Sequence, residues 1–212
     1  MSLFIKLVPV AGVEPEHCAL LTPKENRMLM GFKIRKRQAE WLAGRMAAKR
    51  ALVEALGSLG HSVKPQDIEV LPDSSGRPLW SLTNADASAV PVAAACSLSH
   101  SGEWAIACAS IASRRLGIDI EKIEDRHPAW FEEAFHPAER AGIISIEAAA
   151  DCWAQKEALL KFLGLGLNCD LWNVRPPLFF GRAKEAHENL GAPAVHMRRW
   201  SMGSYRLALA YS

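Results

Sequence analysis

The sequence predicts an α+β fold made of two similar subdomains, residues 1–112 and 113–212. Each half contains apolar runs with a two-residue period, which are typical of strands, and one long pattern of helical period. The long helical patterns cover residues 37–56 and 148–163, and each is followed by a strand hairpin. Two subdomains of about 100 residues have a normal size for compact units.

Matching motifs indicate that the two halves are repeats of one unit. The pattern Trp-x₃-Arg-x₃-Lys that begins at Trp41 parallels the pattern Trp-x₃-Glu-x₃-Lys that begins at Trp153. The apolar run from Trp104 parallels the run from Tyr205, and each closes its half. Chance similarity between two amphipathic helices is the alternative explanation. If the halves are repeats, we expect the active site at their interface, because ligands favour domain interfaces.

The first half begins with a strand over residues 3–10. Thr22, Pro23 and Glu25 then predict a helix start, because threonine can cap, proline fits the first position and glutamate completes a capping box. Basic residues follow, and apolar residues recur at helical spacing further on. We expect a helix over residues 37–56, a strand over 68–71, a turn over 72–78, a loop over 81–91, and strands over 93–99 and 104–111 joined by a turn at 100–103.

The second half opens with β-branched residues in strict alternation, which predict a strand. Prolines then separate short helical patterns from a long one. We expect a strand over residues 116–120, helices over 129–135, 137–144 and 148–163, at most an edge strand over 173–180, and a closing hairpin of strands over 195–200 and 205–211.

Composition and charge exclude several classes of protein. Half of the residues are apolar, which is ample for a core, and the formal charge of +2 is too weak to predict nonspecific nucleic-acid binding. The five cysteines are odd in number and show no CxxC spacing, which favours reduced thiols over disulfides or zinc. The apolar N-terminal run is short and lacks a basic start, so we expect a first strand and not a signal peptide, and no apolar run reaches membrane-spanning length. We therefore expect a cytoplasmic protein without nucleic-acid or membrane partners.

Two short stretches carry the strongest functional signal. In the strand from Leu116, Asp119 and Glu121 point to the same face, because alternate side chains of a strand share a face. In the helix that contains Trp153, Glu157 and Lys161, the three side chains fall on one stripe. Three carboxylates could form a set of hard oxygen ligands for Mg²⁺, and a lysine beside them could hold the charge of a leaving phosphate.

The structural alternative is a solvated strand end and an ordinary surface ion pair worth a few tenths of a kcal/mol. Two residues argue against it: Gly117 suggests a close backbone approach, and Trp153 on the charged stripe could form the wall of a pocket. The sequence has no G-x-S-x-G elbow, no phosphate-binding P-loop and no G-x-G-x-x-G fingerprint. A bound nucleotide would therefore have to be held by Arg, Lys and a metal ion.

These residues resemble the signature of a known family. The motifs are Ser99-His100-Ser101, Gly117-Ile118-Asp119-Ile120-Glu121 and Trp153-x-x-Lys156-Glu157-Ala158-x-x-Lys161. At this spacing they are similar to 4′-phosphopantetheinyl transferases of the surfactin-synthetase-activating, pseudodimeric type, and not to the short trimeric holo-acyl-carrier-protein synthases. The resemblance extends to Gly76-Arg77-Pro78, Trp41-Leu-Ala-Gly-Arg45 and Phe135-His-Pro-Ala-Glu139, with Ala154 where many members carry Ser, Cys or Thr.

The resemblance implies a fold of two subdomains in a pseudo-twofold arrangement and a monomeric enzyme. It implies transfer of the 4′-phosphopantetheine arm from coenzyme A to a serine of an apo acyl or peptidyl carrier protein, with release of adenosine 3′,5′-bisphosphate. Asp119, Glu121 and Glu157 would bind Mg²⁺, with Mn²⁺ as an alternative, and Lys161 would stabilise the departing bisphosphate. Glu157, or a water on the ion, would take the serine proton.

The resemblance also implies a set of coenzyme A contacts. His100 would bond the 3′-phosphate with help from Ser99 and Arg77. Arg27 is a weaker candidate for the same phosphate, and Lys156 for the pyrophosphate.

Two other classes of function compete with this enzyme. A noncatalytic coenzyme A or nucleotide sensor would be favoured by loss of an acidic ligand, but all three carboxylates are present. An interaction module could use the segment 24–50, which holds nine basic and two acidic residues, to bind acidic proteins without a metal. In the enzyme, the same segment could be a docking face for an acidic carrier domain that raises the on-rate.

Overall fold

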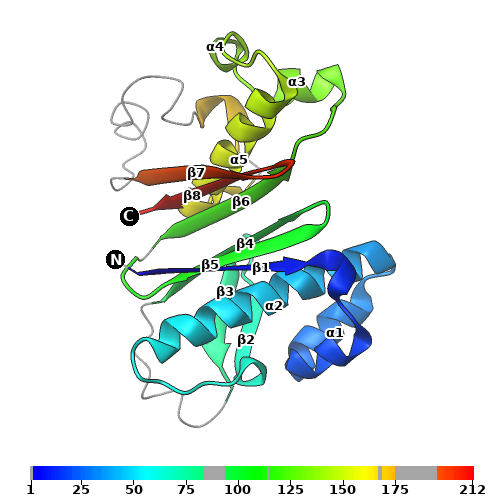
Figure 1. The fold of residues 1–212 in the computed structure, drawn as a ribbon, viewed down its shortest axis with the longest axis vertical. Helices are drawn as coiled ribbons and strands as arrows, with labels where there is room; N and C mark the ends of the chain where they lie inside the picture. The colour runs from blue at the N-terminus through cyan, green and yellow to red at the C-terminus, as the bar shows by residue number, and fades with distance from the viewer. Residues whose placement is uncertain (1, 84–93, 114, 167–168, 175–194) are drawn as a thin grey trace. The chain divides into compact units, whose positions relative to one another are not determined.

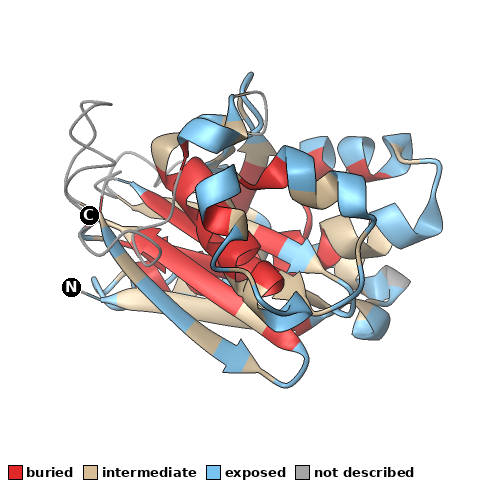
Figure 2. Cartoon of the chain, turned by 90° about the horizontal axis from the view of Figure 1, so that it is seen from above, coloured by how far each residue is buried: buried red, intermediate tan, exposed pale blue. Residues whose placement is uncertain are grey.

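The computed structural model describes residues 2–83, 94–113, 115–166, 169–174 and 195–212, and it divides the chain into two compact units (Figure 1). Unit 1 is Met1–Leu116 and unit 2 is Gly117–Ser212. In both, buried residues lie along the strands and on the helix faces that cover them, while the outward helix faces are exposed (Figure 2).

Unit 1 is a three-stranded antiparallel sheet covered by one long helix. The sheet has the order β1-β5-β4, with β1 at Leu3–Pro9, β5 at Trp104–Ser110 and β4 at Ala95–Ser101. The helix α2, Arg35–Gly57, packs on β5 and β1. Alanines on the helix face meet alanines on β5, so the backbones approach closely; the buried alanines are Ala43, Ala47, Ala51 and Ala55 of α2 and Ala105, Ala107 and Ala109 of β5.

Smaller elements complete unit 1. Helix α1, Pro23–Gly31, begins at the predicted capping box: the Thr22 side chain accepts from the Glu25 backbone, and the Glu25 side chain accepts from the Thr22 backbone. A separate two-stranded sheet pairs β2, Ile68–Pro72, with β3, Pro78–Leu82. Short 3₁₀ helices lie at Val10–Gly12, Pro15–Leu20 and Pro65–Asp67.

Unit 2 repeats the plan of a covered three-stranded sheet. Its order is β6-β8-β7, with β6 at Leu116–Lys122, β8 at Tyr205–Tyr211 and β7 at His196–Met202. Helix α5, Ile146–Leu163, packs on β8 through small residues and ends at Gly164, whose φ of +72° is the left-handed cap conformation. The remaining elements are α3 at Pro128–Ala134, α4 at Pro137–Arg140 and a 3₁₀ helix at Leu171–Asn173.

The two units share one topology, which confirms the α+β fold of two similar subdomains. In each, the three-stranded sheet has one strand before the long helix and a hairpin after it, and the last strand lies at the centre of the sheet; unit 1 has the β2-β3 sheet in addition. The repeat therefore shows in the strand order, and the similarity is not confined to the two amphipathic helices. In both halves the closing strand begins at the predicted aromatic residue, Trp104 or Tyr205.

A buried ion pair is also repeated. In unit 1, Lys49 of α2 lies 2.6 Å from the carboxylate of Glu25, which belongs to the capping box of α1. In unit 2, Lys156 of α5 lies 2.7 Å from the carboxylate of Glu139, which belongs to the capping box of α4. All four side chains are almost fully buried. Removing one partner of such a pair costs about 3–5 kcal/mol, because the other charge stays buried and unpaired.

This pair corrects the alignment of the two long helices. The sequence suggested matching Trp41 with Trp153, but the structure matches Lys49-Arg50-Ala51-Leu52 with Lys156-Glu157-Ala158-Leu159. Tryptophan was a poor marker for the alignment, because its position on a helix depends on local packing. The buried lysine is fixed by a partner on another element.

Other elements differ from the expectation in detail. Residues 78–82 form β3, although residues 72–78 were expected as a turn and 81–91 as a loop; the strand exists because β2 supplies its partners, and it has no periodic signal of its own. Helix α4 stops at Arg140, short of the expected residue 144. The hairpin turn is shorter than 100–103, so that His100 and Ser101 belong to β4. The expected loop at 84–91 and edge strand at 175–180 lie outside the described residues.

Candidate active site

Strand β6 brings its acidic side chains against α5 because Gly117 has no side chain. A Cβ atom on Gly117 would lie 1.9 Å from the Ala158 carbonyl oxygen and 2.5 Å from the Phe162 backbone nitrogen. Strand and helix are therefore in backbone contact at this point. Asp119 and Glu121 follow on the same face of the strand. The close approach that the glycine indicated is confirmed.

Helix α5 supplies the second half of the cluster. The Lys161 ammonium donates to the Asp119 Oδ1 atom at 2.6 Å and to the Ile118 carbonyl at 3.2 Å. The same Nζ atom lies 3.7 Å from the Glu157 Oε2 atom. The structure thus brings together Asp119, Glu157 and Lys161, which lie far apart in sequence.

Glu121 joins the cluster through a residue that the motifs did not indicate. The Arg126 Nη2 atom donates to the Glu121 Oε2 atom at 2.7 Å. Arg126 lies between β6 and α3, outside every motif of the sequence named above. The available signal was indirect: closely spaced, partly buried carboxylates need cations nearby.

The electrostatics of the cluster show an excess of negative charge. Burial, together with the neighbouring Asp119 and Glu157 carboxylates, raises the pKa of Glu121 to about 8 against the opposing effects of Arg126 and Lys161. Burial also raises the pKa of Glu157. Burial lowers the pKa of Lys161, but the Asp119 and Glu157 carboxylates outweigh this and raise it above its ordinary value. The lysine therefore stays charged at neutral pH.

This set of donors fits a divalent cation in its chemistry. Asp119 is buried, Glu121 and Glu157 are mostly buried, and their negative charges repel one another. Hard oxygen ligands of this kind are what Mg²⁺ prefers. Among the residues that the structure describes, no group of three or more His, Cys, Asp or Glu side chains is already spaced for a metal ion. Lys161 instead pairs with Asp119, and Arg126 pairs with Glu121. Asp119, Glu121 and Glu157 could hold a metal once Lys161 yields the Asp119 oxygen, since Arg126 engages only one oxygen of Glu121.

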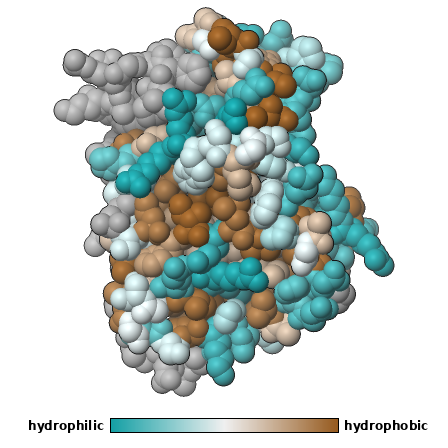
Figure 3. All heavy atoms as spheres, in the orientation of Figure 1, coloured by the Kyte–Doolittle hydropathy of each residue, from teal (hydrophilic) through white to brown (hydrophobic). Residues whose placement is uncertain are grey.

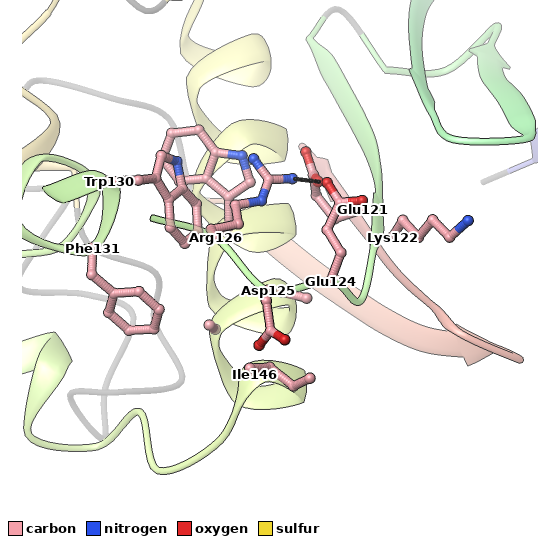
Figure 4. Close-up of a pocket in the computed structure, with 11 residues that line it drawn as sticks. Glu121, Lys122, Glu124, Asp125, Arg126, Trp130, Phe131 and Ile146 are labelled. Atoms are coloured by element: carbon pink, nitrogen blue, oxygen red, sulfur yellow. Dashed lines mark hydrogen bonds and ion pairs between the residues drawn. The ribbon is translucent and has the colours of Figure 1, made fainter. Parts of the chain in front are cut away.

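A small pocket opens beside Glu121 (Figure 4). Its polar side carries Glu121 and Arg126, and its apolar side is formed mainly by Trp130, Phe131 and Trp153. Trp153 lies one turn before Glu157 on α5 and is 7% exposed, so it walls a pocket as expected. On the face drawn in Figure 3, hydrophobic residues gather around α3 and α4, and between α4 and α5 Ile144 is 90% exposed.

Lys156 lies away from this cluster. Its ammonium donates to the Glu139 carboxylate at 2.7 Å and to the Ala134 and Leu171 carbonyls at 2.8 and 3.0 Å. An ammonium has three donors, so all are used inside the protein. The structure therefore gives Lys156 a structural role, and we do not retain it as a ligand of the pyrophosphate.

The other predicted ligand residues belong to unit 1. Ser99 is buried and His100 is exposed on β4. Arg77 lies at the turn between β2 and β3, where its Nε atom donates to the Asp73 carboxylate at 3.2 Å. Arg27 is exposed on α1. That these residues form one site with the carboxylates of unit 2 stays a prediction.

Unit 1 also contains a counterpart of the strand–helix cluster, with inverted charges. The matched lysines, Lys49 and Lys156, place Arg50 where unit 2 has Glu157, and Glu54 where unit 2 has Lys161. Glu54 forms an ion pair with Lys6 of β1, as Lys161 does with Asp119 of β6. A cation and an anion have therefore exchanged places across the same strand–helix contact.

Comparison with known proteins identifies the family. A family model described as the 4′-phosphopantetheinyl transferase superfamily matches residues 115–210. The holo-[acyl-carrier-protein] synthase of Geobacillus kaustophilus is 39% identical over 99 residues, which cover 46% of this chain and 70% of that protein. The chain belongs to the 4′-phosphopantetheinyl transferase superfamily. The family that the motifs predicted is confirmed at this level, and the four clustered residues of unit 2 lie within the matched segment.

Further carrier-protein synthases are similar to part of this chain. The holo-[acyl-carrier-protein] synthase of Chlorobium limicola is 40% identical over 92 residues, covering 41% of this chain and 73% of that protein. Among solved structures, a holo-(acyl-carrier-protein) synthase from Bacillus anthracis in complex with CoA (3′,5′-ADP) is 29% identical, covers 50% of this chain and 91% of its own, and has a TM-score of 0.42. The acyl carrier protein synthase of Mycobacterium tuberculosis is 33% identical and has a TM-score of 0.41. The match covers 50% of this chain and 92% of that chain.

Proposed function

We propose that this phosphopantetheinyl transferase moves the 4′-phosphopantetheine arm of coenzyme A to a serine hydroxyl of an apo acyl or peptidyl carrier protein. The second product is adenosine 3′,5′-bisphosphate. One observation carries the proposal: the segment that matches the superfamily folds so that Asp119, Glu157 and Lys161 form one network beside Glu121. Relatives named holo-[acyl-carrier-protein] synthase support a carrier protein as the acceptor.

The donor chemistry supports Mg²⁺, with Mn²⁺ as an alternative, as the cofactor. Asp119, Glu121 and Glu157 would hold the ion, and when bound it supplies a Lewis acid and a template for the pyrophosphate. Carboxylates alone would repel a pyrophosphate, so these three residues suit the substrate only with a cation between them.

The chain's own residues account for the proton and the leaving group. The serine oxygen forms a bond to the phosphorus that carries the pantetheine, and the bond from this phosphorus to the bridging oxygen of the nucleotide phosphate breaks. Glu157 accepts the serine proton, and its raised pKa makes it a better base near neutral pH. Lys161 stays charged and attracts the negative charge that develops on the departing bisphosphate.

Unit 1 would bind the nucleotide end of coenzyme A. We propose His100 and Ser99 of β4 and Arg77 as ligands of the 3′-phosphate, with Arg27 as a weaker candidate. The support is the family motif at Ser99, His100 and Arg77 and the exposure of His100 and Arg77 on unit 1; for Arg27 it is exposure alone. Replacing His100 by Ala should raise the KM for coenzyme A. The same change should have little effect on the KM for dephospho-coenzyme A, which lacks this phosphate.

The repeat supports the pseudodimeric, surfactin-synthetase-activating subtype and a monomer. Strand order and the buried lysine–glutamate ion pair are both repeated in the two units. A chain with two similar units does not need a second copy of itself, whereas an enzyme with one such unit would. Within the parts of the chain that the structure describes, no helix is long and apolar enough to cross a membrane. We propose the cytoplasm as its location, and coenzyme A and a carrier protein as its partners.

The test is incubation with coenzyme A, Mg²⁺ and an apo carrier protein, followed by mass spectrometry of the carrier. A gain of one phosphopantetheine arm is expected. Asp119→Ala and Glu157→Ala should each slow transfer by orders of magnitude, because both alignment and charge are lost. Asp151→Asn is the matched control, since this carboxylate of α5 pairs with Arg199 outside the cluster. Full activity after chelation of divalent ions would refute the metal-dependent mechanism.

Carrier docking can be tested separately. Lys36 and Arg37 at the start of α2 are exposed, in the basic segment. Reversing both to Glu should raise the KM for the carrier and leave the KM for coenzyme A nearly unchanged. Equal effects on both substrates would exclude this segment as the docking face.

A further inference from the structure

Arg126 is held from two sides beside the proposed metal ligands (Figure 4). Along its edge, the Nη2 atom donates to the Glu121 Oε2 atom at 2.7 Å. On its face, the guanidinium lies over the Trp130 ring, with Cζ 4.7 Å from the ring centroid. Glu124 lies 3.7 Å from the same nitrogen but is about half exposed. Glu121 and Trp130 are therefore the contacts that fix the arginine.

Trp130 is itself fixed by an aromatic cluster. Its ring meets those of Trp153 and Phe135 edge-on, at centroid distances of 5.4 and 5.2 Å. Phe135 is fully buried, and Trp153 is 7% exposed on α5, one turn before Glu157. The position of Arg126 is thus set by the helix that carries another proposed metal ligand.

We propose that Arg126 is a positioning residue that orients the Glu121 carboxylate for the metal. A planar guanidinium donates in fixed directions, so a guanidinium held by an indole fixes the carboxylate it bonds. It engages Oε2 and leaves Oε1 without a bond to Arg126. Groups that hold a ligating carboxylate raise metal affinity, because the ligand does not have to be ordered when the ion binds. This inference rests on the proposed function.

Simple electrostatics predicts the opposite effect. A guanidinium beside a divalent ion repels it, and a cation that only substitutes for the metal would compete for Glu121. Removing such a competitor would tighten metal binding. The sign of the change in metal affinity therefore separates orientation from competition.

The experiment is a titration of the full chain with Mn²⁺ alone, with free Mn²⁺ followed by electron paramagnetic resonance. Arg126→Met should weaken Mn²⁺ binding by about tenfold to a hundredfold. Arg126→Lys should recover only part of this loss, because an ammonium keeps the charge but lacks the planar, directional donors. Arg199→Met is the matched control. It removes an arginine of the same unit from an ion pair of similar length, 2.6 Å to Asp151, and should bind Mn²⁺ like the wild type.

Thermal unfolding of each variant distinguishes loss of orientation from loss of fold. Weakened Mn²⁺ binding at an unchanged melting temperature supports the inference. If Arg126→Met unfolds early, the better-tolerated Arg126→Lys decides, and wild-type affinity there would overturn the inference. Equal or tighter Mn²⁺ binding by Arg126→Met would also overturn it and leave the transferase function intact. Failure of the wild type to bind Mn²⁺ would overturn the proposed metal site and this inference with it.

Discussion

Gly117→Ala tests whether the contact between β6 and α5 builds the active site. The added Cβ atom would lie 1.9 Å from the Ala158 carbonyl oxygen, whereas ordinary contacts begin near 3.4 Å. The obstructing atoms are backbone, so no rotamer change can make room. Strand and helix must therefore separate by about 1.5 Å. Overpacking of this kind costs about 1–3 kcal/mol of unfolding free energy.

The larger effect should be on catalysis. Asp119 is two residues from Gly117 on the strand, and its partner Lys161 is on the helix, now 2.6 Å away. A displacement of about 1 Å in a catalytic group can cost about a hundredfold in rate. We therefore expect Gly117→Ala to slow formation of the holo carrier protein by roughly a hundredfold. At moderate temperature the protein should still be folded, which circular dichroism would show.

Gly44→Ala is the matched control for this experiment. Gly44 lies on α2 of unit 1, where a Cβ atom would meet the Leu98 Cδ1 atom at 3.5 Å, an ordinary contact. Alanine there should be tolerated and should gain helix propensity of up to about 1 kcal/mol. A Gly117→Ala variant with wild-type transfer rate and stability would show that the backbone contact does not set the geometry of the site.

Three further predictions concern charge. Lys156→Met should lower the unfolding free energy by about 3–5 kcal/mol in urea denaturation, because the fully buried Glu139 carboxylate would lose its counter-ion. The pKa of Glu121, about 8 in the folded protein, lies above its ordinary value of 4.5. The folded state therefore binds more protons between these values, and stability should fall as pH rises from about 5 to 8; Glu121→Gln or added Mg²⁺ should reduce the fall. Lys6→Glu and Glu54→Lys should each cost at most about 1 kcal/mol, since the pair is partly exposed, and the double variant should recover the loss with normal transfer activity.

Local signals were enough to predict much of the fold. The capping box at Thr22 and Glu25 was predictable because cap, proline and glutamate act within four residues. Strand β6 and its acidic face followed from a two-residue period, and Gly117 indicated the helix contact. These features depend on neighbours along the chain, which the sequence displays directly.

Features that depend on distant partners could not be predicted in the same way. Strand β3 has no period of its own and forms because β2 offers its edge. Lys156 belongs to a motif that suggested a ligand, but Glu139 and two carbonyls hold it inside. Arg126 has no motif at all, and its importance shows only when Glu121 and Trp130 are seen on either side of it.

The repeated scaffold explains why only one unit should carry a metal site. In both units a buried lysine on the long helix is fixed by a capping-box glutamate, and the next residue of the helix is Arg50 in unit 1 and Glu157 in unit 2. In unit 1, Lys6 and Glu54 form an ion pair whose charges cancel, and Arg50 lies one helical turn before Glu54. In unit 2, three carboxylates lie beside two cations, Lys161 and Arg126. Burial makes that uncompensated charge unfavourable, so a proton or a further cation must relieve it. We therefore expect a divalent ion to bind in unit 2 and not in unit 1, because a few side chains at the strand–helix contact differ in charge.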